Sequence, residues 1–159
     1  MFDKPIYNFL YSLILVLITA AFCSYFNRVG MQNFYSELKL SVLTPPNIVF
    51  PIVWTVLYIL LTMAFYYILN TADKTLIRPV ATLFTFNLFL QVLWTFVFFY
   101  NAYFFSGFVI LIILDFATGL LVWAFYKINR TAGLMLIPYF LWVIFATYLN
   151  WAIVVLNHS

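Results

Sequence analysis

The stretch PVATLFTFNLFLQVLWTFVFFYNAYFFSGFVILIILDFATGLLVWAFY, residues 79–126, is apolar along its whole length and contains a single charged residue, Asp115. A helix needs about 20 apolar residues to cross the ~30 Å hydrocarbon core of a bilayer, so this stretch is too long for one span. It divides at the aromatic turn Tyr100-Asn101-Ala102-Tyr103 and at Ser106-Gly107. The pattern predicts two membrane-spanning helices, over 79–99 and 104–126.

Charge-free runs on both sides extend the same pattern. Residues 5–27, 40–72 and 131–157 carry no charge, and they predict further spans near 6–26, 47–69 and 133–156. Apolar residues make up 67% of the chain and charged residues 7%, against about 45–50% and about 25% in an average globular domain. So few charges cannot cover a water-soluble surface, which excludes soluble and disordered proteins. We expect one all-α domain, residues 1–159: an integral membrane bundle of five transmembrane helices in a lipid bilayer.

The charged and metal-ligating residues exclude several functional classes. Seven Lys and Arg residues, spread over the chain, form no patch that could bind nucleic acid. One cysteine, Cys23, and one histidine, His158, cannot make an internal disulfide or a metal site, and we expect no metal and no required cofactor. Cys23 is expected to pack as a small apolar residue. No catalytic triad or phosphate-binding glycine loop is present, which disfavours an enzyme.

The distribution of basic residues predicts the orientation, because Lys and Arg concentrate in cytoplasmic loops. Five of them fall at the N-terminus and in the second and fourth loops, and two fall in the first loop: Lys4, Lys74, Arg78, Lys127 and Arg130 against Arg28 and Lys39. This imbalance predicts an N-terminus in the cytoplasm and a C-terminus outside. The first loop, residues 27–46, is the longest, and a loop of that length often serves as a lid. Pro45 and Pro46 close it and are expected to set the entrance of the second span.

Polar residues in the spans indicate an interior site, because they are costly against lipid. They form stripes at helical spacing with aromatic neighbours: Trp54 and Tyr58; Asn87, Gln91 and Trp94; Trp142, Phe145, Ala146 and Asn150. Counted from the helix ends, the stripes converge in depth below the first loop, which predicts an aromatic pocket with a few amides. For Asn87 and Gln91 an equal alternative is hydrogen bonding between helices. Asp115, the one intramembrane acid, belongs to this pocket or serves as a helix clamp.

Several motifs resemble the translocator protein family, also called the tryptophan-rich sensory protein or peripheral benzodiazepine receptor family, in its bacterial type. Pro45-Pro46 followed by Val53-Trp54-Thr55 and Leu57-Tyr58 is similar to the entrance of its second helix. Ile137-Pro138-Tyr139-Phe140-Leu141-Trp142, with Phe145-Ala146-Thr147 and Leu149-Asn150, resembles its fifth helix. Asn87, Gln91, Trp94 and Asp115 match its third and fourth helices.

This resemblance implies a five-helix bundle, commonly a homodimer, in a bacterial cell membrane. It implies a pocket that binds porphyrins such as protoporphyrin IX, haem-related tetrapyrroles, sterols, and synthetic benzodiazepine or isoquinoline-carboxamide ligands, for transport or sensing. Trp54, Trp142, Ala146, Asn87 and Gln91 match pocket positions. An alternative is light- and oxygen-dependent degradation of porphyrin, for which Trp54 and Trp142 would be the catalytic pair. One departure is Leu43, which stands at the lid position where the family usually has a tryptophan.

Overall fold

The computed structural model describes residues 4–157, and every regular element in that range is helical. The elements are α1 (Pro5–Asn33), η1 (Tyr35–Glu37), α2 (Val49–Thr71), α3 (Lys74–Thr95), η2 (Phe96–Tyr100), α4 (Phe104–Ile128), α5 (Arg130–Met135) and α6 (Ile137–Asn157). Five helical segments are long and apolar enough to cross a membrane, with α3–η2 and α5–α6 each counting as one. The predicted five-helix transmembrane bundle is confirmed.

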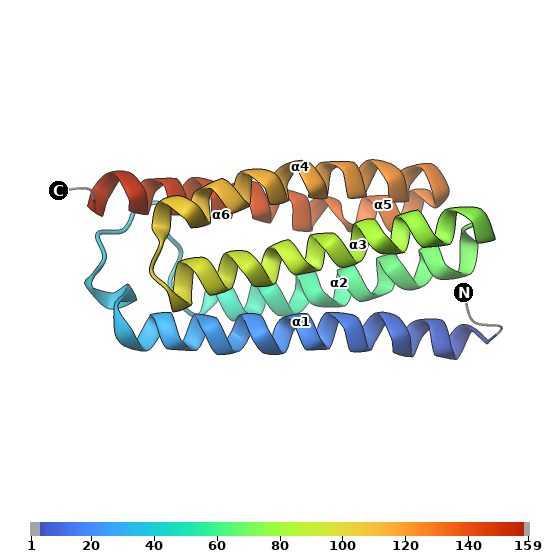
Figure 1. Cartoon of the computed structure of the whole chain (residues 1–159), viewed down its shortest axis with the longest axis horizontal. Coiled ribbons are helices and arrows are strands. Elements are labelled where there is room, and N and C mark those ends of the chain that lie inside the picture. The colour runs from blue at the N-terminus through green and yellow to red at the C-terminus, as the bar shows by residue number, and fades with distance from the viewer. Residues whose placement is uncertain (1–3, 158–159) are drawn as a thin grey trace.

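The helices run nearly side by side along one axis (Figure 1). Helix α4 packs against α3 and α6, and α1 packs against α2, α3 and η2. One end carries η1, the turn between η2 and α4, and the end of α6; the opposite end carries the start of α1 and the turn between α2 and α3 (Figure 1). Since lipid offers no hydrogen-bond partners, helices that satisfy their own backbone are the structure that such apolar segments must adopt.

Several spans are longer than their charge-free runs predicted. Helix α1 continues to Asn33 rather than residue 26, so the connection to α2 is 34–48 instead of 27–46. Helix α3 begins at Lys74 rather than at residue 79, and Pro79 lies inside it. Long basic side chains can keep their charge in water while their stems lie against apolar surface, so a charge near a membrane surface does not end a helix.

The predicted turn between the third and fourth spans is confirmed in part. Residues 101–103 connect η2 to α4, and Ala102 adopts a left-handed φ of 56°. The pair Ser106-Gly107, however, lies inside α4 and takes no part in the turn. Gly107 instead permits a close approach, since a Cβ there would lie 3.0 Å from the Asn150 Oδ1 atom and 3.2 Å from the Phe98 Cβ atom.

The fifth span is interrupted near its start. The Asn129 side chain caps α5 by accepting a hydrogen bond of 3.0 Å from the backbone N–H of Ala132. Leu136 separates α5 from α6, and Pro138 follows in the first turn of α6, where its missing N–H is tolerated. Pro45 and Pro46 lie just ahead of α2, and the Pro46 carbonyl accepts a 2.9 Å hydrogen bond from the Val49 N–H.

Candidate functional site

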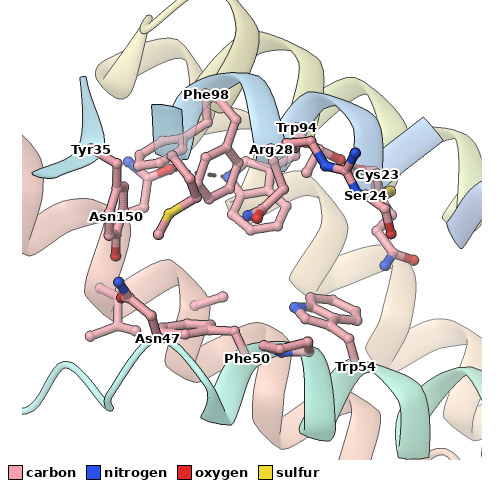
Figure 2. Close-up of a pocket in the computed structure, with 18 of the residues that line it drawn as sticks. Cys23, Ser24, Arg28, Tyr35, Asn47, Phe50, Trp54, Trp94, Phe98 and Asn150 are labelled. Carbon is pink, nitrogen blue, oxygen red and sulfur yellow. Dashed lines mark hydrogen bonds between the residues drawn. The ribbon is translucent and has the colours of Figure 1, made fainter. Parts of the chain in front are cut away.

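A cavity of about 350 Å³ lies within the bundle, near the end that carries η1. Figure 2 shows the open space between its walls. Its lining comes from α1, the first loop, α2, α3, η2 and α6: Cys23, Ser24, Asn27, Arg28, Met31, Tyr35, Asn47, Phe50, Pro51, Trp54, Tyr58, Gln91, Trp94, Thr95, Phe98, Phe99, Trp142, Ala146, Leu149, Asn150 and Ile153. The size falls within the range of about 300–1,000 Å³ typical of small-molecule sites.

Three tryptophans from three different helices form the walls. Trp54 of α2 lies 5.6 Å from Tyr58 between ring centroids, one helical turn along the same stripe. Trp142 of α6 packs edge-on against Phe50 at 5.9 Å. Trp94 of α3 contacts Phe98 at 6.1 Å. These aromatic contacts restrict the orientations of the indole rings and leave broad apolar faces along the cavity.

The indole N–H of Trp94 and the side chain of Asn150 are joined by a buried hydrogen bond. Trp94 donates to the Asn150 Oδ1 atom at 3.2 Å, and the Asn150 Nδ2 atom donates to the carbonyl of Phe104 at 2.8 Å. The pair therefore ties α3, α6 and the start of α4 together at one depth. This contact agrees with the sequence-based expectation that the two stripes meet at the same height.

Gln91 leaves a polar atom unsatisfied beside the cavity. Its Nε2 atom donates to the Tyr58 hydroxyl at 3.0 Å, while its Oε1 atom is buried without a hydrogen-bond partner among the described residues. The side chain is 1% exposed. A buried acceptor of this kind costs about 1–3 kcal/mol when it is left unpaired. A ligand that donates a hydrogen bond here would remove that cost.

Two predicted polar site residues lie outside the cavity lining. Asn87 is fully buried, where it donates to the Thr118 hydroxyl at 2.8 Å and accepts from the Tyr139 hydroxyl at 2.8 Å. In the structure Asn87 therefore forms hydrogen bonds between helices, which was the alternative to a place in the pocket. Asp115 accepts a 2.8 Å hydrogen bond from Thr147, which links α4 to α6 as a clamp.

Four further predicted residues also lie away from the lining. Phe145 faces a separate shallow hollow between α2 and α6, together with Ile52, Val56 and Leu141. The predicted lid residues Leu43, Pro45 and Pro46 do not line the cavity; Tyr35 and Asn47 from the same connection do. Leu43 was expected there from the family resemblance and the two prolines from their position at the entrance of α2, whereas the parts of the connection that line the cavity lie nearer its two ends.

The contribution of α1 to the wall of the cavity was not predicted from the sequence. Cys23, Asn27 and Met31 recur every four residues, and Ser24 and Arg28 lie beside them. Since the first span was expected to end at residue 26, most of this stripe was assigned to the loop. Cys23 is buried and accepts a 3.2 Å hydrogen bond from Thr95. A search for helical spacing continued past Arg28 could have found this wall.

Tyr35 lines the cavity from η1, which lies outside the membrane-spanning segments. Its ring lies 6.0 Å from that of Phe99, and it is 8% exposed. Burial raises the pKa of its phenol, which keeps the hydroxyl protonated to an even higher pH than usual and able to donate a hydrogen bond. Among residues 4–157, no three His, Cys, Asp or Glu side chains gather as metal ligands would. His158 lies outside the described residues.

The fold and the cavity together define a multi-pass integral membrane protein with an aromatic intramembrane pocket. The model of the TspO/MBR family matches residues 12–156, so the chain belongs to that family. It is 35% identical over 146 residues to the tryptophan-rich protein TspO of Archaeoglobus fulgidus, covering 92% of this chain and 94% of the relative.

Two further relatives cover most of the chain. The tryptophan-rich sensory protein of Cereibacter sphaeroides is 28% identical over 126 residues, which cover 79% of this chain and 78% of the relative. Protein CrtK of Rhodobacter capsulatus is 32% identical over 127 residues, which cover 77% of this chain and 78% of the relative. The resemblance that the sequence motifs indicated is thus confirmed at the level of the family.

Proposed function

We propose that this membrane protein binds tetrapyrroles, such as protoporphyrin IX or haem-related compounds, in the cavity between its helices. The observation that carries the proposal is the group of three tryptophans, Trp54, Trp94 and Trp142, around a volume of about 350 Å³. Flat aromatic macrocycles pack well against indole faces, and Gln91 offers a hydrogen-bond acceptor to a ligand. Ala146 adds a small side chain to the wall and leaves room for the ligand.

A role in transport or sensing is supported by family membership and by the name of the Cereibacter sphaeroides relative, a tryptophan-rich sensory protein. We extend the proposal to a homodimer in a cell membrane, with the N-terminus in the cytoplasm. Sterols and benzodiazepine or isoquinoline-carboxamide compounds are further ligand classes to be assayed in the same cavity. The homodimer, the cell membrane and the further ligand classes rest on the family resemblance, and the orientation rests on the distribution of basic residues.

Tryptophan fluorescence tests the proposal directly. Protoporphyrin IX should quench the fluorescence of the purified protein in a saturable way, at roughly micromolar concentration. A Trp54→Ala, Trp142→Ala double variant should bind at least about tenfold more weakly, because it removes two walls of the cavity. The matched control is Trp123→Ala with Trp151→Ala, since neither residue lines the cavity and both are exposed. Equal affinity of the two double variants would contradict the site.

A second candidate function is photo-oxidative degradation of porphyrin. Its support is that Trp54 and Trp142, the two residues implied for that reaction, both line the cavity. Loss of porphyrin absorbance under illumination should then require oxygen and should slow in the Trp54→Ala, Trp142→Ala variant. The comparison is made at porphyrin saturation of each protein. Equal decay with and without the two tryptophans would identify ordinary photobleaching.

A further inference from the structure

Arg28 is the one charged residue among the described residues that line the cavity. It lies on α1, about one turn before the helix ends at Asn33, and its side chain is exposed. No ion pair joins it to another residue in the range 4–157, and no carboxylate in that range shares the lining. A fixed positive charge is therefore available beside an apolar cavity.

The surroundings of Arg28 are polar on one side and aromatic on the other. Ser24 and Asn27, neighbours of Arg28 on α1, also line the cavity, whereas Asn47 of the first loop lies across the open space beside Phe50 (Figure 2). In Figure 2, Arg28 lies on the same wall as Trp94, and Trp54 and Phe50 lie across the open space. The cavity thus combines tryptophan faces with a cationic, polar stretch of α1.

A guanidinium in this position has a definite chemical preference. Arg stays protonated at any physiological pH, and its planar N–H groups match a carboxylate or phosphate through two parallel hydrogen bonds. The aromatic side of its surroundings lowers the local dielectric and so strengthens such a contact relative to one on a fully solvated surface. A neutral ligand would leave this charge unused, whereas a ligand with an acidic edge would pair with it.

We propose that Arg28 determines specificity for ligands in which a flat apolar body carries a carboxylate at its edge. The body packs among Trp54, Trp94 and Trp142, and the carboxylate pairs with the guanidinium. This inference rests on the proposed function and adds to it a rule of selection: acids bind better than their esters. The same anion chemistry could be supplied by the phosphate of a lipid headgroup, so the test must separate these two sources.

The experiment compares protoporphyrin IX with its dimethyl ester, which keeps the macrocycle and removes both negative charges. Affinities are measured by fluorescence quenching for the unmodified protein, Arg28→Gln, Arg28→Lys and the control Lys39→Gln. Lys39 is exposed in the connection that follows α1, outside the cavity lining, and its replacement by Gln changes the net charge by the same amount. Each protein is assayed in neutral detergent and in vesicles with and without phosphatidylglycerol.

Arg28→Gln should weaken binding of the diacid about three- to tenfold and leave the ester within about twofold, with Arg28→Lys intermediate. Lys39→Gln should change neither. Equal losses for acid and ester, or no loss for either, would overturn the role of Arg28 while leaving porphyrin binding intact. An effect that requires phosphatidylglycerol and is the same for both probes would assign Arg28 to a lipid headgroup and overturn the inference. Failure of the unmodified protein to bind either porphyrin would overturn the proposed function and the inference with it.

Discussion

Ala146 is the smallest side chain in the α6 wall of the cavity, one helical turn beyond Trp142. Replacing it with threonine adds a branched group that enters the space a ligand would occupy. Overpacking of this kind costs about 1–3 kcal/mol, which corresponds to a loss of affinity of about fivefold to a hundredfold. We therefore expect Ala146→Thr to weaken ligand binding more than it lowers the melting temperature.

Affinity and melting temperature measured on one detergent preparation test this expectation. Ala146→Ser is the matched control, because it adds a hydroxyl without the branch. A large fall in melting temperature with intact affinity would instead place Ala146 in a helix contact and remove it from the site.

Asn87 should behave in the opposite way to the cavity residues. Its amide links α3 to Thr118 of α4 and Tyr139 of α6, and it does not line the cavity. Asn87→Ala removes both hydrogen bonds in a fully buried place, at a cost of about 1–3 kcal/mol. We expect thermal unfolding in detergent at a clearly lower temperature, with porphyrin affinity within about twofold of the unmodified protein at a temperature where both are folded. A selective loss of affinity would return Asn87 to the site.

At the scale of elements, the contact between α1 and η2 depends on a glycine. A Cβ atom at Gly30 would lie 2.7 Å from the Phe99 carbonyl oxygen and 2.8 Å from its Cδ1 atom, so the two segments would have to separate. At Gly119 of α4 the nearest atom to such a Cβ, Phe140 Cζ, is 3.5 Å away, an ordinary contact. Gly30→Ala should therefore destabilise the protein by about 1–3 kcal/mol, whereas Gly119→Ala should be neutral or stabilising because alanine favours a helix.

Melting temperatures of the two glycine variants in the same detergent provide the measurement. Because Phe99 also lines the cavity, Gly30→Ala should lower ligand affinity as well. Equal melting temperatures for the two variants would show that α1 and η2 can move apart at little cost.

The elements also show what the sequence could predict and what it could not. The number of spans follows from the length of apolar runs, a property that any bilayer imposes on any chain. The ends of α1 and α3 do not, because Arg28 and Lys74 are compatible with a helix at a membrane surface. The error at α1 then hid the α1 wall of the cavity, including the residue that supplies its charge.

For the polar residues of the spans, too, the sequence predicts one property and leaves another undetermined. Their spacing indicated that they face the interior of the bundle, and Asn87, Gln91, Asp115 and Asn150 all have hydrogen bonds to neighbouring helices. Spacing alone could not tell which of them also faces an empty volume. That depends on the rotation of each helix and on the side chains that it meets. Thr118 and Tyr139 form hydrogen bonds with Asn87, whereas the Gln91 Oε1 atom has no hydrogen-bond partner among the described residues.

At the scale of the whole molecule, the cavity belongs to one end of the bundle. The first connection is fastened there to the end of α6, where Asn157 accepts a hydrogen bond from the Lys39 N–H and donates one to the Lys39 carbonyl, each 3.0 Å long. The Ser41 and Tyr148 hydroxyls add a 2.9 Å contact. Which compartment this end faces decides from which side a water-soluble ligand reaches the cavity.

The distribution of basic residues predicts that this end faces outward. Cys23 is the one cysteine in the chain, and serine can replace it as an acceptor for the Thr95 hydroxyl, so a Cys23→Ser background allows single labels. Lys39 lies in the connection between η1 and α2, and Lys74 begins α3; these elements lie at opposite ends of the bundle (Figure 1), and both positions are exposed. In intact cells a membrane-impermeant maleimide should label Lys39→Cys at once and Lys74→Cys only after the membrane is opened. Labelling of Lys74→Cys alone would show the reverse topology, and water-soluble ligands would then reach the cavity from the cytoplasm. In that case another determinant of membrane insertion would outweigh the imbalance of five basic residues against two.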